Sequence, residues 1–289
     1  MTGLPNEAAS GARRNPFAGR EFQLRLVSGV VLAAFVVWAL VIGGGLFALI
    51  WLAAAVVGTA EWIGMSRTGP RRLLVAVIAV TLGGLALCLR EGASPLVFVA
   101  VAAAGITGLL IVARDGAARG RAVAGLAGGA VVALVPPGLR DDPAIGILGP
   151  AWMFAVVWST DVVAYITGRT FGGPKLMPAV SPKKTWSGAL GGLTAGTAAG
   201  IGAVIIARDH GGSALAATSL LLVGLVSAAA SVFSQAGDLA ESALKRHWGV
   251  KDSGRSIPGH GGVMDRLDGF AAVALLAGLY LLAHRMGAV

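Results

Sequence analysis

Residues 95–113, PLVFVAVAAAGITGLLIVA, form a run without a single charge, of the length that a helix needs to cross the hydrocarbon core of a membrane. Similar runs occur near residues 26–43, 46–63, 73–89, 121–137, 146–167, 188–207, 214–237 and 268–286. Only 13% of the 289 residues are charged and the mean hydropathy is +0.79, whereas about a quarter of a soluble domain is charged. The sequence therefore predicts an all-α, polytopic integral membrane protein with about nine transmembrane helices.

The basic residues predict the orientation of these helices. If all nine runs span the membrane, 19 of the 23 Lys and Arg fall on the side of the N-terminus. Only Arg90, Arg140, Arg208 and Arg285 fall on the far side. Cytoplasmic loops carry such an excess, so we expect a cytoplasmic N-terminus and a C-terminus on the far side. The net charge of +9 then reflects topology, and we expect no nucleic-acid partner.

The apolar run that follows Arg25 lacks a convincing cleavage site, so we expect an uncleaved first helix and a bacterial inner membrane. We divide the chain into a disordered cytoplasmic tail (1–22), a transmembrane scaffold of about five helices (23–145) and a catalytic region of about four helices (146–289). The catalytic region contains cytoplasmic loops at 168–187 and 238–268. Glu61 and Trp62 close the second run, and we interpret Trp62 as an interfacial anchor. Glu61 could assist a site, but we favour a solvated helix end.

Four glycines follow one face of the seventh run at intervals of four, at positions 188, 192, 196 and 200. Such a ridge allows another helix to approach closely. The spacing does not say whether that helix belongs to the same chain, so a homodimer stays open.

Polar residues gather at three places in the catalytic region. The first is the end of the sixth run, where Asp161, Tyr165 and Arg169 share one helical face. A carboxylate below the membrane surface costs about 2–3 kcal/mol unless it is paired or hydrated. Asp161 is therefore either the buried partner of a basic residue on another helix or part of the wall of a cytoplasmic cavity.

The second cluster is the segment SPKKTW (181–186), which contains Lys183 and Lys184. Paired lysines beside anionic lipid often serve only to orient a membrane protein. Because a second basic loop lies on the same side, we favour phosphate binding for this pair.

The third cluster covers residues 238–268. Asp238, Glu241, Ser242 and Lys245 have the spacing of one helical stripe. Clustered cations beside clustered carboxylates suit a phosphorylated substrate with a divalent metal, and the glycine-rich turn could present backbone N–H groups to phosphate. His260 has no zinc-ligand pattern around it, so we expect it to contact phosphate or to fix the loop.

Residues 242–268 resemble the signature of the CDP-diacylglycerol synthase family, also called phosphatidate cytidylyltransferases. Here the pattern is S-A-L-K-R, four residues, K-D, and then S-G-R-S-I-P-G-H-G-G-V-M-D-R-L-D. SPKKTW, residues 161–172 and residues 237–239 also resemble the family, so the resemblance covers about 150–286. Ser187 departs from it, because an acidic residue is expected after SPKKTW.

The resemblance implies that CTP and phosphatidate give CDP-diacylglycerol and diphosphate with Mg²⁺, and it leaves a second metal or a monovalent cation open. It implies metal ligation by Asp238 and Asp265, with Asp268 as a further or supporting ligand. Arg246 and Lys251 join Lys245, His260 and Arg266 as the expected catalytic set. The expected substrate-binding set is Lys183, Lys184, Ser181, Arg169, Tyr165, Asp161, Gly261 and Gly262.

Two other functions remain as alternatives. A related lipid-linked phosphotransferase or kinase would use similar charges. A transporter is disfavoured, because the charges lie on one side of the membrane and the sequence shows no internal repeat.

Overall fold

The computed structural model describes residues 20–209, 218–257 and 261–286, with backbone only for 20–28. Within this part of the chain, nine α-helices and one two-stranded sheet follow one another. The helices are α1 (Arg20–Ile42), α2 (Gly44–Met65), α3 (Arg71–Arg90), α4 (Pro95–Val112), α5 (Gly116–Arg140), α6 (Leu148–Phe171), α7 (Trp186–Asp209), α8 (Leu220–His247) and α9 (Met264–Arg285). Each predicted apolar run corresponds to one helix, which confirms the all-α membrane fold. Helices α2 to α9 are long and apolar enough to span a membrane, and the described apolar part of α1 is Gly29–Ile42.

The contacts divide the chain into two units, Met1–Val37 and Trp38–Val289. The first contains most of α1, and the second contains the end of α1 and every later element. The break between α1 and α2 lies at Gly43 and Gly44, whose φ angles are +67° and +58°. Glycine adopts this left-handed region without the steric cost that other residues meet there, so the chain can end one helix and start the next without a loop.

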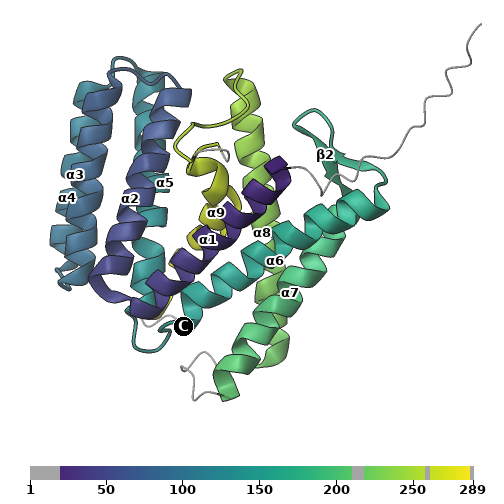
Figure 1. The fold of residues 1–289 in the computed structure, drawn as a ribbon. Coiled ribbons are helices and arrows are strands. Elements are labelled where there is room, and N and C mark those ends of the chain that lie inside the picture. The colour runs from purple at the N-terminus through teal and green to yellow at the C-terminus, as the bar shows by residue number, and fades with distance from the viewer. Residues whose placement is uncertain (1–19, 210–217, 258–260, 287–289) are drawn as a thin grey trace, which may run out of the picture. The chain divides into compact units, whose positions relative to one another are not determined.

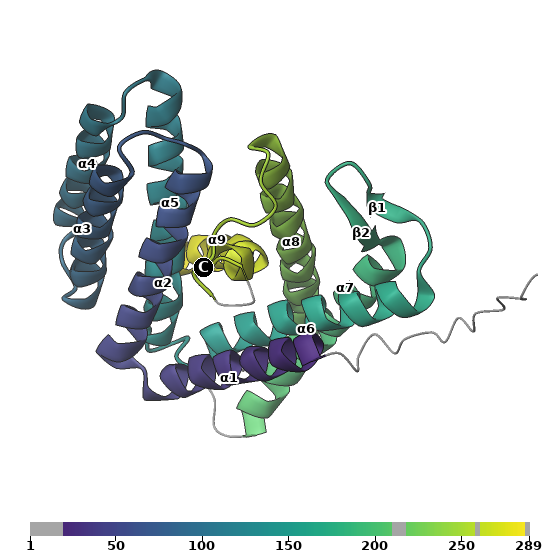
Figure 2. The same cartoon turned by 45° about the horizontal axis from the view of Figure 1, so that its top comes forward.

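Within the second unit, α2 to α5 pack against one another, and α6 to α9 form a second group (Figures 1 and 2). Helix α9 joins the groups, because it contacts α2, α5, α6 and α8. Stacked aromatic rings fill this junction: Trp51 of α2 lies 4.8 Å from Phe270 of α9 and 6.1 Å from Phe154 of α6, between ring centroids. Burial of these large rings fixes α9 between the two groups.

The glycine ridge of α7 packs inside the chain, against α6 and α8. A Cβ atom at Gly188 would lie 2.8 Å from the carbonyl oxygen of Ala164, and one at Gly192 would lie 2.8 Å from that of Thr160. Beside the ridge, the hydroxyls of Thr160 on α6 and Ser231 on α8 are hydrogen-bonded at 2.8 Å. The close approach that the spacing predicted is therefore made between helices of one chain.

The connections that follow α2, α6 and α8 lie at one end of this unit (Figure 1). They are the turn at 66–70, the segment at 172–185 and the segment at 248–263. The middle one, predicted as loop, contains an antiparallel hairpin of β1 (Lys175–Met177) and β2 (Ser181–Thr185). The strands are too short and too polar to show a period of two, so the sequence pattern did not reveal them.

Helix α8 continues to His247, so the polar stripe from Asp238 to Lys245 is helical, as its spacing indicated. The connection to α9 is correspondingly shorter than the predicted loop at 238–268. The helical extension carries charged side chains past the apolar run toward the segment at 248–263.

Candidate active site

Three helices bring a carboxylate to the same region: Asp161 from α6, Asp238 from α8 and Asp268 from α9. Each of the three lies within electrostatic range of the other two. The approach depends on Gly237, because a Cβ there would lie 2.8 Å from the backbone oxygen of Asp268. The first and third polar clusters of the sequence therefore meet where α8 crosses α9.

The second cluster joins them through Lys184 on β2. Its Nζ lies 2.5 Å from Oδ2 of Asp238, and the Ser242 hydroxyl donates to the other oxygen of Asp238 at 3.4 Å. Asp161 lies within electrostatic range of Lys184 and Arg266 as well. A basic hairpin thus covers one side of an acidic group that comes from three helices.

Asp161 itself is exposed, and no Lys or Arg in the described ranges forms an ion pair with it. One turn along α6, the Arg169 guanidinium donates to the Tyr165 hydroxyl at 2.9 Å. The described residues thus show no ion pair for Asp161, and its place in the wall of a cavity stays a prediction.

A second charged group lies further along α8. The Lys245 ammonium contacts Glu241 at 3.1 Å and Asp265 at 2.7 Å. Asp265 also accepts from the backbone N–H groups of Ser253 at 3.0 Å and Gly262 at 2.8 Å. Asp265 therefore connects two points of the segment at 248–263 to Lys245 on α8.

Glu61 lies in a different environment from the one that the sequence predicted. It was expected at a solvated helix end, but only 4% of its surface is exposed. Its carboxylate accepts from the Ser253 hydroxyl at 3.2 Å and from the backbone N–H groups of Val263 at 3.1 Å and Met264 at 2.9 Å. The expectation was wrong because a segment about 190 residues later covers the end of α2.

The neighbouring Trp62 is also involved in packing between elements. Its indole N–H donates to the backbone oxygen of Arg121 at 2.8 Å, and its ring meets the edge of Trp248 with 5.1 Å between centroids. The sequence contained a signal for these contacts: Glu61 and Trp62 lie within the apolar helix and not in the polar turn after it.

The other predicted site residues are spread around these groups. Lys183, Arg246, Lys251 and Arg266 are exposed, and Ser181 is half-buried on β2. The N–H of Gly262 is taken by Asp265, and the carbonyl of Gly261 accepts from Ile257, so both glycines shape the loop. His260 lies outside the described residues.

A family model described as the cytidylyltransferase family matches residues 23–284. The chain belongs to this family. A protein of Brucella abortus (strain 9-941) named phosphatidate cytidylyltransferase is 40% identical over 263 residues, which cover 90% of this chain and 92% of that protein. One of the same name from Staphylococcus haemolyticus (strain JCSC1435) is 44% identical over 131 residues, 45% of this chain and 48% of that protein.

The match confirms the predicted family and extends further than the sequence motifs did. They covered about 150–286, whereas the family match begins at residue 23. The N-terminal helices of this cytidylyltransferase are thus part of the family's fold, which agrees with the contacts of Glu61.

Ser187, where an acidic residue was expected, has a structural role. Its hydroxyl donates to the backbone oxygen of Gly172 at 2.5 Å and lies 3.0 Å from the Thr185 hydroxyl. It joins the end of the hairpin to the end of α6 without a charge.

Magnesium ligation by the carboxylates of this cytidylyltransferase stays a prediction. In the described ranges, no group of three or more His, Cys, Asp or Glu side chains is close enough to form a ready-made metal cage. Mg²⁺ is usually held by one or two carboxylates together with waters and substrate phosphates. Asp238 and Asp268 lie within electrostatic range of each other, so they are the candidate pair.

Proposed function

We propose that this cytidylyltransferase converts CTP and phosphatidate to CDP-diacylglycerol and diphosphate at the carboxylate group of α6, α8 and α9. The observation that carries the proposal is the ion pair between Lys184 and Asp238, which joins a basic hairpin to the crossing of α8 and α9. The family match and the name of the Brucella relative support this reaction.

The hairpin region is suited to the lipid substrate. Phe171, Met177 and Trp186 are exposed around it, and Lys183 is exposed beside them. Aromatic and basic side chains together are typical of a membrane–water interface, which is where the phosphatidate headgroup lies. We assign Lys183, Lys184 and Arg169 to the lipid phosphate.

Lys184 can move between two anionic partners. In the structure its ammonium is paired with Asp238, and both side chains are only partly buried. A phosphate that arrives beside the hairpin would compete for the ammonium and leave Asp238 open. Binding of the lipid would thereby free the Asp238 carboxylate to bind magnesium.

In the reaction, an oxygen of the lipid phosphate attacks the α-phosphorus of CTP. A new P–O bond forms there, and the bond to the β-phosphate oxygen breaks, so diphosphate leaves with its electron pair. Such transfers depend on positioning and charge neutralisation and need no protein nucleophile. We assign charge neutralisation at the leaving diphosphate to Lys245, Arg246, Lys251 and Arg266.

Magnesium bound at Asp238 and Asp268, together with substrate phosphate oxygens, would neutralise further phosphate charge. Asp265 stays a predicted ligand. Its oxygens already accept from Lys245, Ser253 and Gly262, so ligation by Asp265 requires Lys245 to move away.

The chain is a multi-pass membrane protein, and we place it in the bacterial inner membrane with the site facing the cytoplasm. The supporting observation is that most of the basic residues fall on the side of the hairpin and of the segment at 248–263. This orientation would expose the site to cytoplasmic CTP.

The test is an assay of the full-length protein, purified in detergent, with CTP, phosphatidate and Mg²⁺. We expect CDP-diacylglycerol and diphosphate in equal amounts, and no product when the metal is chelated. A parallel reaction with diacylglycerol in place of phosphatidate tests the kinase alternative. Phosphorylation of diacylglycerol without any CDP-diacylglycerol synthesis would overturn the proposal.

A further inference from the structure

A cavity of about 420 Å³ lies between the C-terminal end of α2 and the segment that follows α8. Its lining includes Glu61 and Arg71 from the first half of the chain, and Asp252, Ser253 and Arg255 from the second. Its volume is within the range of small-molecule binding sites. None of the residues predicted from the sequence to bind substrate lines it.

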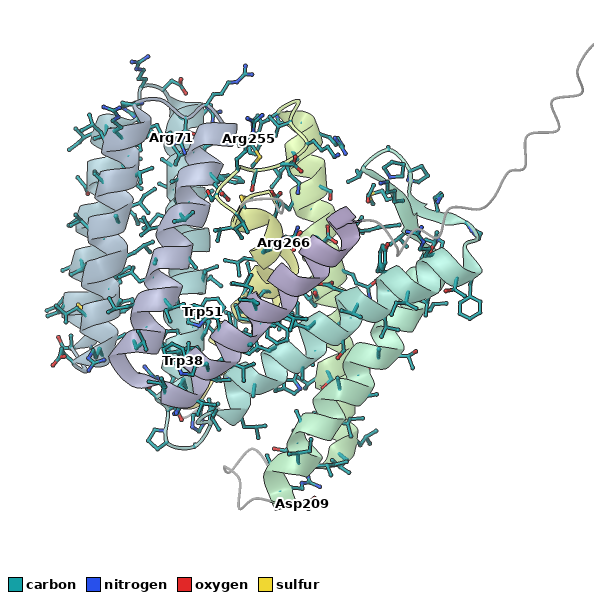
Figure 3. All side chains as sticks on the ribbon, in the orientation of Figure 1. Trp38, Trp51, Arg71, Asp209, Arg255 and Arg266 are labelled. Carbon is teal, nitrogen blue, oxygen red and sulfur yellow. The ribbon has the colours of Figure 1, made fainter. Side chains whose placement is uncertain are left out.

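Two arginines, Arg71 and Arg255, line this cavity. Within the described ranges neither Arg71 nor Arg255 forms an ion pair, although both line the same space. Figure 3 shows the two side chains at the same end of the helices. Arg71 packs over Gly64, where a Cβ would lie 3.3 Å from its Cζ. Two guanidiniums at one cavity, with no ion-pair partner among the residues that the structure describes, are suited to phosphate oxygens.

The two acidic residues of the cavity differ in what they can still bind. Glu61 already accepts three hydrogen bonds from the protein. Asp252 is exposed and forms no ion pair among the described residues. Its carboxylate can accept hydrogen bonds from hydroxyl or amino groups but repels phosphate. The free groups therefore suit a ligand with phosphates at one part and hydrogen-bond donors at another.

We propose that this cavity holds the nucleotide substrate, with Arg71 and Arg255 on its phosphates and Asp252 accepting from its sugar or base. The inference rests on the proposed function. A nucleotide fits this lining better than free phosphate does, because only the nucleotide has sugar and base groups that can donate hydrogen bonds to Asp252.

The cavity is also connected to the charged groups of the site. Ser253 lines it, donates through its hydroxyl to Glu61 and donates through its backbone N–H to Asp265. Asp265 in turn holds Lys245. A nucleotide in the cavity would therefore touch the segment that positions a cation for the leaving diphosphate.

The first experiment measures steady-state kinetics of the full-length protein in detergent, with CTP and phosphatidate varied separately. We expect Arg71→Ala and Arg255→Ala each to raise the KM for CTP about tenfold, the effect of losing one charge-assisted contact, and to leave the KM for phosphatidate unchanged. Arg72→Ala is the matched control, because Arg72 is the exposed neighbour of Arg71 on α3 and does not line the cavity. Arg71→Lys should fall between wild type and Arg71→Ala.

The second experiment measures equilibrium binding of CTP, diphosphate and cytidine without phosphatidate. Asp252→Asn should weaken CTP and cytidine but not diphosphate, whereas the two arginine variants should weaken CTP and diphosphate but not cytidine. Monodisperse elution and an unchanged melting temperature confirm that a variant is folded. If Arg71→Ala does not fold, Arg71→Lys and Arg255→Ala take its place.

The outcomes separate this inference from the proposed function. An active wild type whose KM for CTP is the same in both arginine variants would overturn the cavity assignment and leave the reaction intact. A rise in the KM for phosphatidate instead would also overturn it, because the cavity would then take the lipid phosphate. If the wild type makes no CDP-diacylglycerol, the proposed function fails, and the binding data alone decide whether the cavity takes a nucleotide.

Discussion

Glu61 on α2 and Ser253 in the segment after α8 are joined by a hydrogen bond of 3.2 Å, although 192 residues separate them. Asp265 binds the backbone N–H of the same serine. Two carboxylates, one from each half of the chain, therefore hold Ser253. The N-terminal helices do more than support the fold, because they fix the position of the segment before α9.

Replacement of Glu61 by Ala should lower kcat/KM about a hundredfold, because misplacement of catalytic groups by about 1 Å has effects of this size. The variant leaves Val263 and Met264 without their carboxylate acceptor, so hydrogen exchange in 248–263 should also become faster. Glu91→Ala is the control, because Glu91 is exposed at the end of α3. Slow exchange in 248–263 together with normal kinetics in Glu61→Ala would contradict this role.

Asp265→Asn separates loop positioning from metal binding. The variant weakens the contact with Lys245, so turnover should fall at least tenfold. If Asp265 acts through Lys245 alone, the Mg²⁺ concentration for half-maximal rate should not change. A large increase in that concentration would show that Asp265 is a metal ligand, as the sequence resemblance implied.

Substitution at Gly196 should destabilise the α6–α7–α8 packing. A Cβ at this position overlaps the Thr160 hydroxyl and lies 3.0 Å from that of Ser231, whereas a Cβ at Gly202 meets nothing within 4 Å. Gly196→Ala should lower stability by about 1–3 kcal/mol, the usual cost of overpacking. Thermal unfolding in detergent compares it with Gly202→Ala, and equal melting temperatures for the two variants would argue against this packing.

Cysteine labelling tests the orientation. In a Cys88→Ser background, Met177→Cys places a thiol on the hairpin, and Asp209→Cys places one at the other end of α7 (Figure 3). An impermeant thiol reagent on intact spheroplasts should label position 209 and not position 177. After lysis both should react, and the reverse pattern in intact cells would invert the topology.

The helices could be predicted from the sequence because hydrophobicity alone determines which segments enter the membrane. The grouping of Asp161, Lys184 and Asp238 was also foreseeable in outline, since all three end up on the basic side. The approach of Asp268 to this group was not, because it depends on the close crossing of α8 and α9 at Gly237. Local spacing cannot reveal contacts of this kind.

Glu61 illustrates the same limit more strongly. Its helix shows no polar partner at helical spacing, and its three donors come from a segment whose path depends on the whole fold. The hairpin at 175–185 escaped prediction for a different reason. Its pairing is set by the ends of α6 and α7, and its residues have little strand propensity of their own.

The central claim is that the reaction takes place at the cluster of carboxylates around Asp238. The most direct measurement is CDP-diacylglycerol synthesis by wild type, Asp238→Asn and Asp209→Asn at equal amounts of folded protein. Asp209 is exposed at the far end of α7 from the hairpin, so Asp209→Asn should match wild type. We predict that Asp238→Asn loses at least 99% of the activity at every Mg²⁺ concentration, because it removes the charge that pairs with Lys184 and that we propose to bind the metal. Synthesis by Asp238→Asn at the wild-type rate would contradict the account.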